Sequence, residues 1–124
     1  MARHNETGKL GEQAAVDLLL AKGYAIVDRN WRMGHLEIDI VAQRGPRVAI
    51  VEVKTRTGDF ADPFDAVDRR KQLAMVRAGE AYVKAYGLPH ELQFDIIAVT
   101  GNPDNLKIEH LEDAFPPPLK TYGS

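Results

Sequence analysis

Three ionisable residues in the middle of the chain have types and spacing that suit metal-dependent phosphate chemistry. Glu52 and Lys54 are two positions apart within a nearly continuous run of β-branched residues, and Asp39 lies in the preceding apolar segment. Side chains alternate across a strand, so Glu52 and Lys54 should share one face. If the two segments form a hairpin, its register can bring the carboxylates of Asp39 and Glu52 to one end of the pair.

Two converging carboxylates repel each other, and a hard divalent cation such as Mg²⁺ or Mn²⁺ relieves that repulsion. We therefore expect Asp39 and Glu52 to be metal ligands, with the backbone carbonyl of Val53 as a third oxygen. A metal here acidifies a bound water and stabilises charge on a phosphate. Lys54 is expected to position or deprotonate that water and to offset the developing charge.

A further acid, Glu12, falls on the sheet-facing line of the first predicted helix, with Ala15, Val16 and Leu19. It is expected to ligate the metal, directly or through water, or to hold Lys54 in place. The alternative for Glu12 is a first-turn acid that favours the helix dipole. The alternative for Glu52 and Lys54 is an ordinary salt bridge across one face. The alternative for Asp39 is exposure to solvent. Glu37 shares the face of Asp39 and is an alternative ligand or, as we expect, an exposed neighbour.

The elements that must position these residues follow from hydrophobic periodicity and from turn residues. Thr7 is expected to cap the first helix and Gly23 to stop it, while Asp62-Pro63 opens the second helix and Gly87 ends it. The turn 43–46 makes its flanking strands antiparallel neighbours, and the second of these is apolar on both faces, as a central strand is. The predicted elements are a helix over 8–22, a strand over 24–27 that continues irregularly to 32, strands over 36–42 and 47–54, a helix over 62–86, strands over 92–100 and 106–110, and an extended Pro-rich tail over 115–124.

The order αβββαββ predicts an α/β fold with a mixed sheet of about five strands flanked by helices. The 124 residues fit one domain over 1–124, and the lack of cysteine excludes disulfides and thiolate chemistry. We find no signal peptide and no apolar run long enough to span a membrane, so a cytoplasmic protein without a membrane partner is expected. The net charge of −2 is not that of a protein that coats nucleic acid, yet it does not exclude a nucleic-acid enzyme.

Basic residues on the second helix suggest where a nucleic acid would lie. Arg70, Arg77 and Lys84 recur every seven residues, Lys71 thickens the start of this stripe, and Arg56 follows the central strand. Such a stripe can track phosphates, and the alternative is a solvated helix face. Trp31 is expected either to stack on a base or to belong to the core. The four histidines lack metal-ligand spacing, and none is predicted to be catalytic.

A set of motifs resembles the YraN family of small bacterial proteins, which belongs to the restriction-endonuclease-like superfamily with its PD-(D/E)xK site. The most specific part is Glu-Ile-Asp at 37–39 followed by Val-Glu-Val-Lys-Thr-Arg at 51–56. The other matching residues are Gly8, Gly11-Glu12, Ala15, Gly23-Tyr24, Asn30-Trp31-Arg32, Lys71 and Phe94-Asp95.

The resemblance implies a three-layer nuclease-like core over about 8–111 and similarity to Holliday-junction resolvases, hence a branched-DNA endonuclease. It implies metal ligation by Asp39 and Glu52, catalysis by Lys54, an accessory acid at Glu12, and an active-site or phosphate-contacting role for Lys71. Two positions depart from the family pattern. Leu36 stands where the family usually has a glycine. Gln93 stands where the family often has an arginine, and the change removes a candidate phosphate contact.

Two rival functions stay open at this point. One is a nucleic-acid-binding module without catalysis, suggested by the net charge and by Gln93. The other is a protein-interaction domain in which Asp39 or Glu52 forms a structural pair with Lys54. A junction-specific enzyme would be a twofold homodimer, because two matched cuts need two centres.

Overall fold

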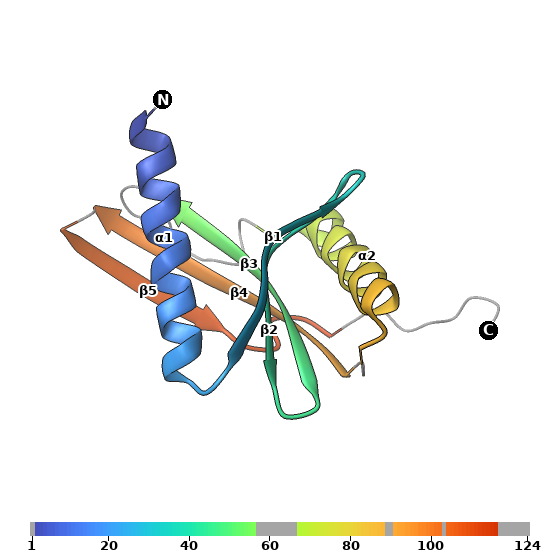
Figure 1. The fold of residues 1–124 in the computed structure, drawn as a ribbon. Helices are drawn as coiled ribbons and strands as arrows, with labels where there is room; N and C mark the ends of the chain where they lie inside the picture. The colour runs from blue at the N-terminus through green and yellow to red at the C-terminus, as the bar shows by residue number, and fades with distance from the viewer. Residues whose placement is uncertain (1, 57–66, 89–90, 103, 117–124) are drawn as a thin grey trace.

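The structure is a computed structural model that describes residues 2–56, 67–88, 91–102 and 104–116. Its elements follow the predicted order, which confirms the αβββαββ arrangement (Figure 1). The elements are α1 (Ala2–Ala21), β1 (Ala25–Met33), β2 (Leu36–Arg44), β3 (Arg47–Arg56), α2 (Arg69–Tyr86), β4 (Glu91–Asn102) and β5 (Asn105–Leu111). No helix among the described residues is long and apolar enough to cross a membrane.

The five strands form one mixed sheet in the order β1-β2-β3-β4-β5. Only the β3–β4 pair is parallel, and α2 provides the crossover between these two strands. The central strand β3 is the nearly continuous β-branched run, as predicted, and both of its faces are covered. Helix α1 lies over one face of the sheet and α2 over the other, so the fold has three layers (Figure 1).

Each layer boundary has its own apolar core, and alternation along β3 divides that strand between them. Val48 and Ile50 belong to the core under α2, whereas Ala49 and Val51 belong to the core under α1. Both helices approach the sheet at a glycine. A Cβ on Gly11 of α1 would lie 2.4 Å from Thr55 Oγ1, and one on Gly79 of α2 would lie 2.9 Å from Ile50 Cγ1. The close approach at Gly11 places α1 against Thr55, near the end of β3 that carries the candidate site.

Several predicted boundaries were wrong. Helix α1 begins at Ala2, so Thr7 lies inside it, because 2–7 contains no glycine or proline to interrupt a helix. Helix α2 begins at Arg69, where Asp68 caps it by accepting the backbone N–H of Lys71 at 2.9 Å. The expected start at 62–63 and most of the expected tail lie outside the described residues. Gly87 ends α2 in the left-handed conformation, at φ 62°, as predicted.

Candidate active site

The site lies where the hairpin of β2 and β3 stops pairing. Cross-strand pairs run from Arg44 and Arg47 to Ile40 and Val51, and one further step of this register places Asp39 opposite Glu52. Instead of continuing the ladder, Asp39 accepts the backbone N–H of Val53 through Oδ2 at 2.8 Å. The ladder thus ends at the two acids that the sequence separates, and Glu52 is close enough for its negative charge to act on Asp39.

The electrostatics of Asp39 reflect this arrangement. Burial raises the pKa of Asp39 to about 6, and the negative charge of Glu52 is the second cause of the rise. The Val53 hydrogen bond and the positive charge of Lys71 lower the pKa, and the charge of Glu12 raises it slightly. A carboxylate in this position is held in its charged form at an energetic cost that a nearby cation would offset.

Glu52 is paired with two lysines. Lys54 Nζ lies 3.2 Å from Glu52 Oε2, and Lys71 Nζ lies 3.3 Å from the same oxygen. The exposed fractions of the side chains are 12% for Glu52, 19% for Lys54 and 38% for Lys71. The shared face of Glu52 and Lys54 is thus as predicted, and Lys71 reaches the pair from the first turn of α2.

Glu12 lies on the sheet side of α1, among the buried residues that the sequence predicted, but it does not hold Lys54. Its Oε1 accepts from Arg29 Nη2 at 2.9 Å and from Asn30 Nδ2 at 3.2 Å. These two consecutive strand residues both reach α1, whereas strict alternation would send one of them to the other face. The positive φ of Asn30, 54°, rotates the chain and makes the arrangement possible.

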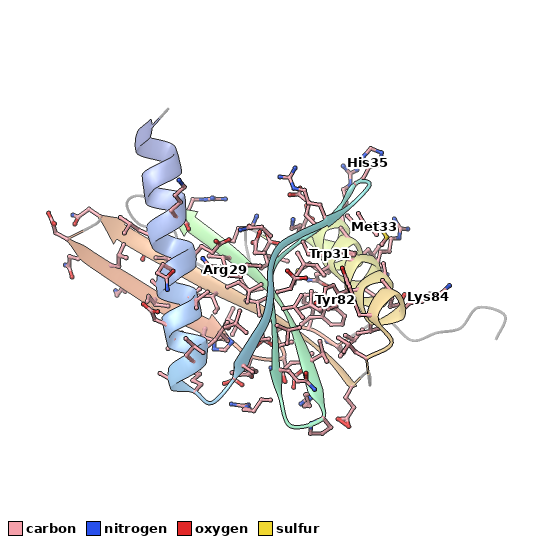
Figure 2. All side chains as sticks on the ribbon, viewed as in Figure 1. Arg29, Trp31, Met33, His35, Tyr82 and Lys84 are labelled. Atoms are coloured by element: carbon pink, nitrogen blue, oxygen red, sulfur yellow. The ribbon has the colours of Figure 1, made fainter. Side chains whose placement is uncertain are left out.

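The same rotation turns Trp31 toward α2. Its ring packs edge-on against Tyr82 at 5.2 Å, and only 7% of the residue is exposed. Figure 2 shows Arg29 on the α1 side of β1 and Trp31 with Tyr82 on the α2 side. Of the two roles considered for Trp31, the structure therefore favours the core over stacking on a base.

The donor set can be compared with what a divalent cation needs. Among the described residues no three His, Cys, Asp or Glu side chains are grouped to hold a metal. The set consists of Asp39, Glu52 and the main chain of Val53, whose carbonyl shares an edge of β3 with the N–H that Asp39 accepts. Two carboxylates and a carbonyl fit Mg²⁺, which keeps several water ligands. In chemical type, the donors present are therefore those that Mg²⁺ accepts.

The predicted basic stripe is exposed along α2. Arg70, Arg77 and Lys84 are all exposed, and Arg56 is exposed at the end of β3. Lys71 differs from them because its side chain turns inward to Glu52. Glu37, which we considered as an alternative ligand, lies at the surface and pairs with Arg32 at 3.2 Å.

Sequence reasoning missed a buried polar network on the α1 side of the sheet. Asp95 is fully buried, and its Oδ2 lies 2.8 Å from His110 Nε2, whose Nδ1 lies 2.8 Å from Lys22 Nζ. Gln93 is also buried, and its amide donates to Asp95 and to Tyr24. Position 93 therefore does not face a phosphate, contrary to the role expected for an arginine there. The sequence signal that could have revealed this network is Asp95, an acid within the otherwise apolar run of β4.

Comparison with known proteins identifies close relatives of the whole chain. The family model described as "Uncharacterised protein family UPF0102" matches residues 11–99. The chain is 51% identical over 120 residues to a UPF0102 protein of Bacteroides thetaiotaomicron, with 96% of this chain and 99% of the relative covered. It is 47% identical over 116 residues to the UPF0102 protein FP2501 of Flavobacterium psychrophilum, with 93% and 98% covered.

Proposed function

This chain belongs to the UPF0102 family of YraN-like proteins, and we propose that it is a Mg²⁺- or Mn²⁺-dependent endodeoxyribonuclease. The observation that carries the proposal is the meeting of Asp39 and Glu52 at the end of the β2–β3 ladder, with Lys54 on Glu52. Branched or processed DNA is the substrate class, as the resemblance to junction resolvases implies. We also propose that the protein acts in the cytoplasm and forms a homodimer.

The reaction is hydrolysis of a phosphodiester by in-line attack of water. A bound metal supplies an acidified water and stabilises charge on the phosphate. Asp39 and Glu52 provide the negative charge that holds the cation, and the Val53 carbonyl adds a neutral oxygen. Lys54 orients the attacking water as the ammonium that pairs with Glu52, or takes a proton from that water as the neutral amine and so becomes the ammonium. In either case its positive charge stabilises the phosphate oxygens as the bond to the leaving oxygen breaks.

The residues around this centre have supporting roles. Arg29 and Asn30 hold Glu12 on α1, near enough for its charge to act on Asp39, and from there it would support the metal as an accessory acid. Arg70, Arg77 and Lys84 form an exposed line that can contact the phosphate backbone, and Arg56 extends it near the centre.

One observation favours a second candidate, a DNA-binding module without catalysis. Each acid at the site already has a partner within the protein, since Glu52 meets Lys54 and Lys71, and Glu12 meets Arg29. Such pairing can hold a fold together without a metal. This candidate predicts DNA binding that Asp39→Ala leaves unchanged.

Cleavage assays separate the two candidates. End-labelled linear, flapped and four-way-junction DNA is incubated with the protein and Mg²⁺, Mn²⁺ or a chelator, alongside Asp39→Asn and Lys54→Ala. The nuclease predicts metal-dependent cutting that both variants lose. Measurable DNA binding without cutting of any substrate favours the binding module. If the protein neither cuts nor binds any of these DNA substrates, the protein-interaction domain is favoured.

A further inference from the structure

Lys71 is a cation that the two acidic side chains at the site share. Its Nζ lies 3.3 Å from Glu52 Oε2, and its positive charge also lowers the pKa of Asp39. Both of these acids are the ligands proposed for the metal. The ammonium of Lys71 therefore acts electrostatically on the same two groups that a divalent cation would bind.

We propose that Lys71 is a displaceable occupant of the metal site, which pairs with Glu52 when metal is absent and moves to a DNA phosphate when metal binds. The inference rests on the proposed function, because it assigns the metal to Asp39 and Glu52. This movement of Lys71 from Glu52 to a phosphate makes metal binding and DNA binding reinforce each other. Since such coupling is reciprocal, each ligand must raise the affinity for the other by the same factor.

The surroundings of Lys71 explain why it moves and Lys54 stays. Lys54 is adjacent to Glu52 on one face of β3 and is half as exposed as Lys71, 19% against 38%. The backbone N–H of Lys71 donates to Asp68 at 2.9 Å, so the main chain is fixed in the first turn of α2. Only the flexible side chain has to swing outward, toward the exposed Arg70.

Charge repulsion supplies the driving force. Lys54 and Lys71 already place two ammonium groups on a single oxygen of Glu52. A divalent cation on the same carboxylate repels both of them over short distances in a half-buried site, where screening is weak. A phosphate beside the start of α2 offers Lys71 a new anion, and the positive end of the helix dipole favours that phosphate.

Mn²⁺ titration without DNA tests the first half of the proposal. Calorimetry at pH 8, where Asp39 is ionised, compares the wild type with Lys71→Met and with Arg69→Met, which removes an exposed charge from the same turn. We expect Lys71→Met to bind Mn²⁺ at least about fivefold more tightly, the lower end of ordinary coupling, and Arg69→Met to stay within about twofold of the wild type. Unchanged affinity in folded Lys71→Met overturns the proposal.

DNA binding tests the second half. Fluorescence anisotropy measures the affinity for a labelled four-way junction in Ca²⁺ and in chelator. We expect Lys71→Met to weaken binding in Ca²⁺ and to have little effect in chelator, because Glu52 then holds the lysine. Equal weakening in both conditions identifies Lys71 as a plain phosphate contact and overturns the proposal. A wild type that binds no Mn²⁺ overturns the proposed metal centre as well, so the two failures are distinguishable.

Discussion

The backbone N–H of Val53 donates to Asp39 Oδ2 at 2.8 Å, just beyond the last cross-strand pair of β2 and β3. A side chain thus replaces the next backbone partner in the ladder. In a strand the N–H and C=O of one residue point to the same side, so the Val53 carbonyl faces the gap that Asp39 occupies. The end of the ladder, rather than the sequence motif alone, brings the oxygens together.

The charge state of Asp39 predicts how stability depends on pH. Burial raises the pKa of Asp39 to about 6 in the folded protein, so the fold favours the protonated side chain. This stabilisation is complete below pH 3.8 and is lost as the pH rises from 3.8 to about 6. Asp39→Asn keeps an oxygen acceptor for Val53 without the charge. We expect the variant to be more stable than the metal-free wild type by about 2 kcal/mol at pH 7, and by much less at pH 4.

Urea unfolding of both proteins at pH 4, 6 and 7.5 provides the measurement. Addition of Mn²⁺ at pH 7.5 should narrow the difference, because the ion binds the wild type and stabilises it. A constant difference between the two proteins at all pH values would contradict a raised pKa for Asp39.

The close approach of α1 to β3 predicts opposite effects at two glycines of one helix. Gly11→Ala places a Cβ 2.4 Å from Thr55 Oγ1, and we expect a loss of about 1–3 kcal/mol in the free energy of unfolding. Gly8→Ala meets nothing within 4 Å and should stabilise the helix by about 0.5–1 kcal/mol. Thr55→Ala should rescue much of the Gly11→Ala loss in a double-mutant cycle. Additive effects in that cycle would show that α1 crosses elsewhere.

Much of this arrangement could be predicted from the sequence, because it depends on local patterns. The β-branched run around Glu52 identified the central strand, the turn at 43–46 identified its neighbour, and alternation placed Lys54 beside Glu52. These features need only the periodicity of a strand and the chemistry of a turn.

Other features depend on contacts between distant segments and could not be predicted. The pairing of Glu12 with Arg29 requires both the crossing of α1 at Gly11 and the left-handed Asn30. The contact of Lys71 with Glu52 depends on where α2 begins, and the sequence pattern placed Lys71 well inside a longer helix rather than in the first turn that Asp68 caps. Neither side chain has a local signal that reveals its partner.

The exposed line on α2 predicts a charge-specific effect on DNA affinity. We expect Arg77→Gln to weaken junction binding and to reduce the slope of log affinity against log salt by about 0.9, the value for one lost phosphate contact. Lys107→Gln removes an exposed charge from β5 and serves as the control. Anisotropy titrations over a range of KCl concentrations give both slopes. Equal changes in the two variants would indicate a general charge effect and would remove α2 from the DNA surface.

The network around His110 predicts a loss of stability without a loss of metal binding. Lys22 donates to Nδ1 of His110, so the proton on Nε2 is donated to the buried Asp95. His110→Phe leaves Asp95 short of one donor, and we expect the free energy of unfolding to fall by about 1–3 kcal/mol. Mn²⁺ affinity below the melting temperature should not change. Weaker Mn²⁺ binding by the folded variant would give this network a role in the site.

The charge of Glu52 should be visible in the titration of Asp39. In Glu52→Gln the repulsion between the two side chains disappears, so the pKa of Asp39 should fall from about 6. It should stay above 3.8, because burial is the largest cause of the shift and is unaffected. Carbon-detected NMR of the Asp39 carboxyl group in metal-free protein measures the change, with Glu37→Gln as the exposed control. A pKa that stays at about 6 in Glu52→Gln would place the two carboxylates too far apart in solution to share one cation.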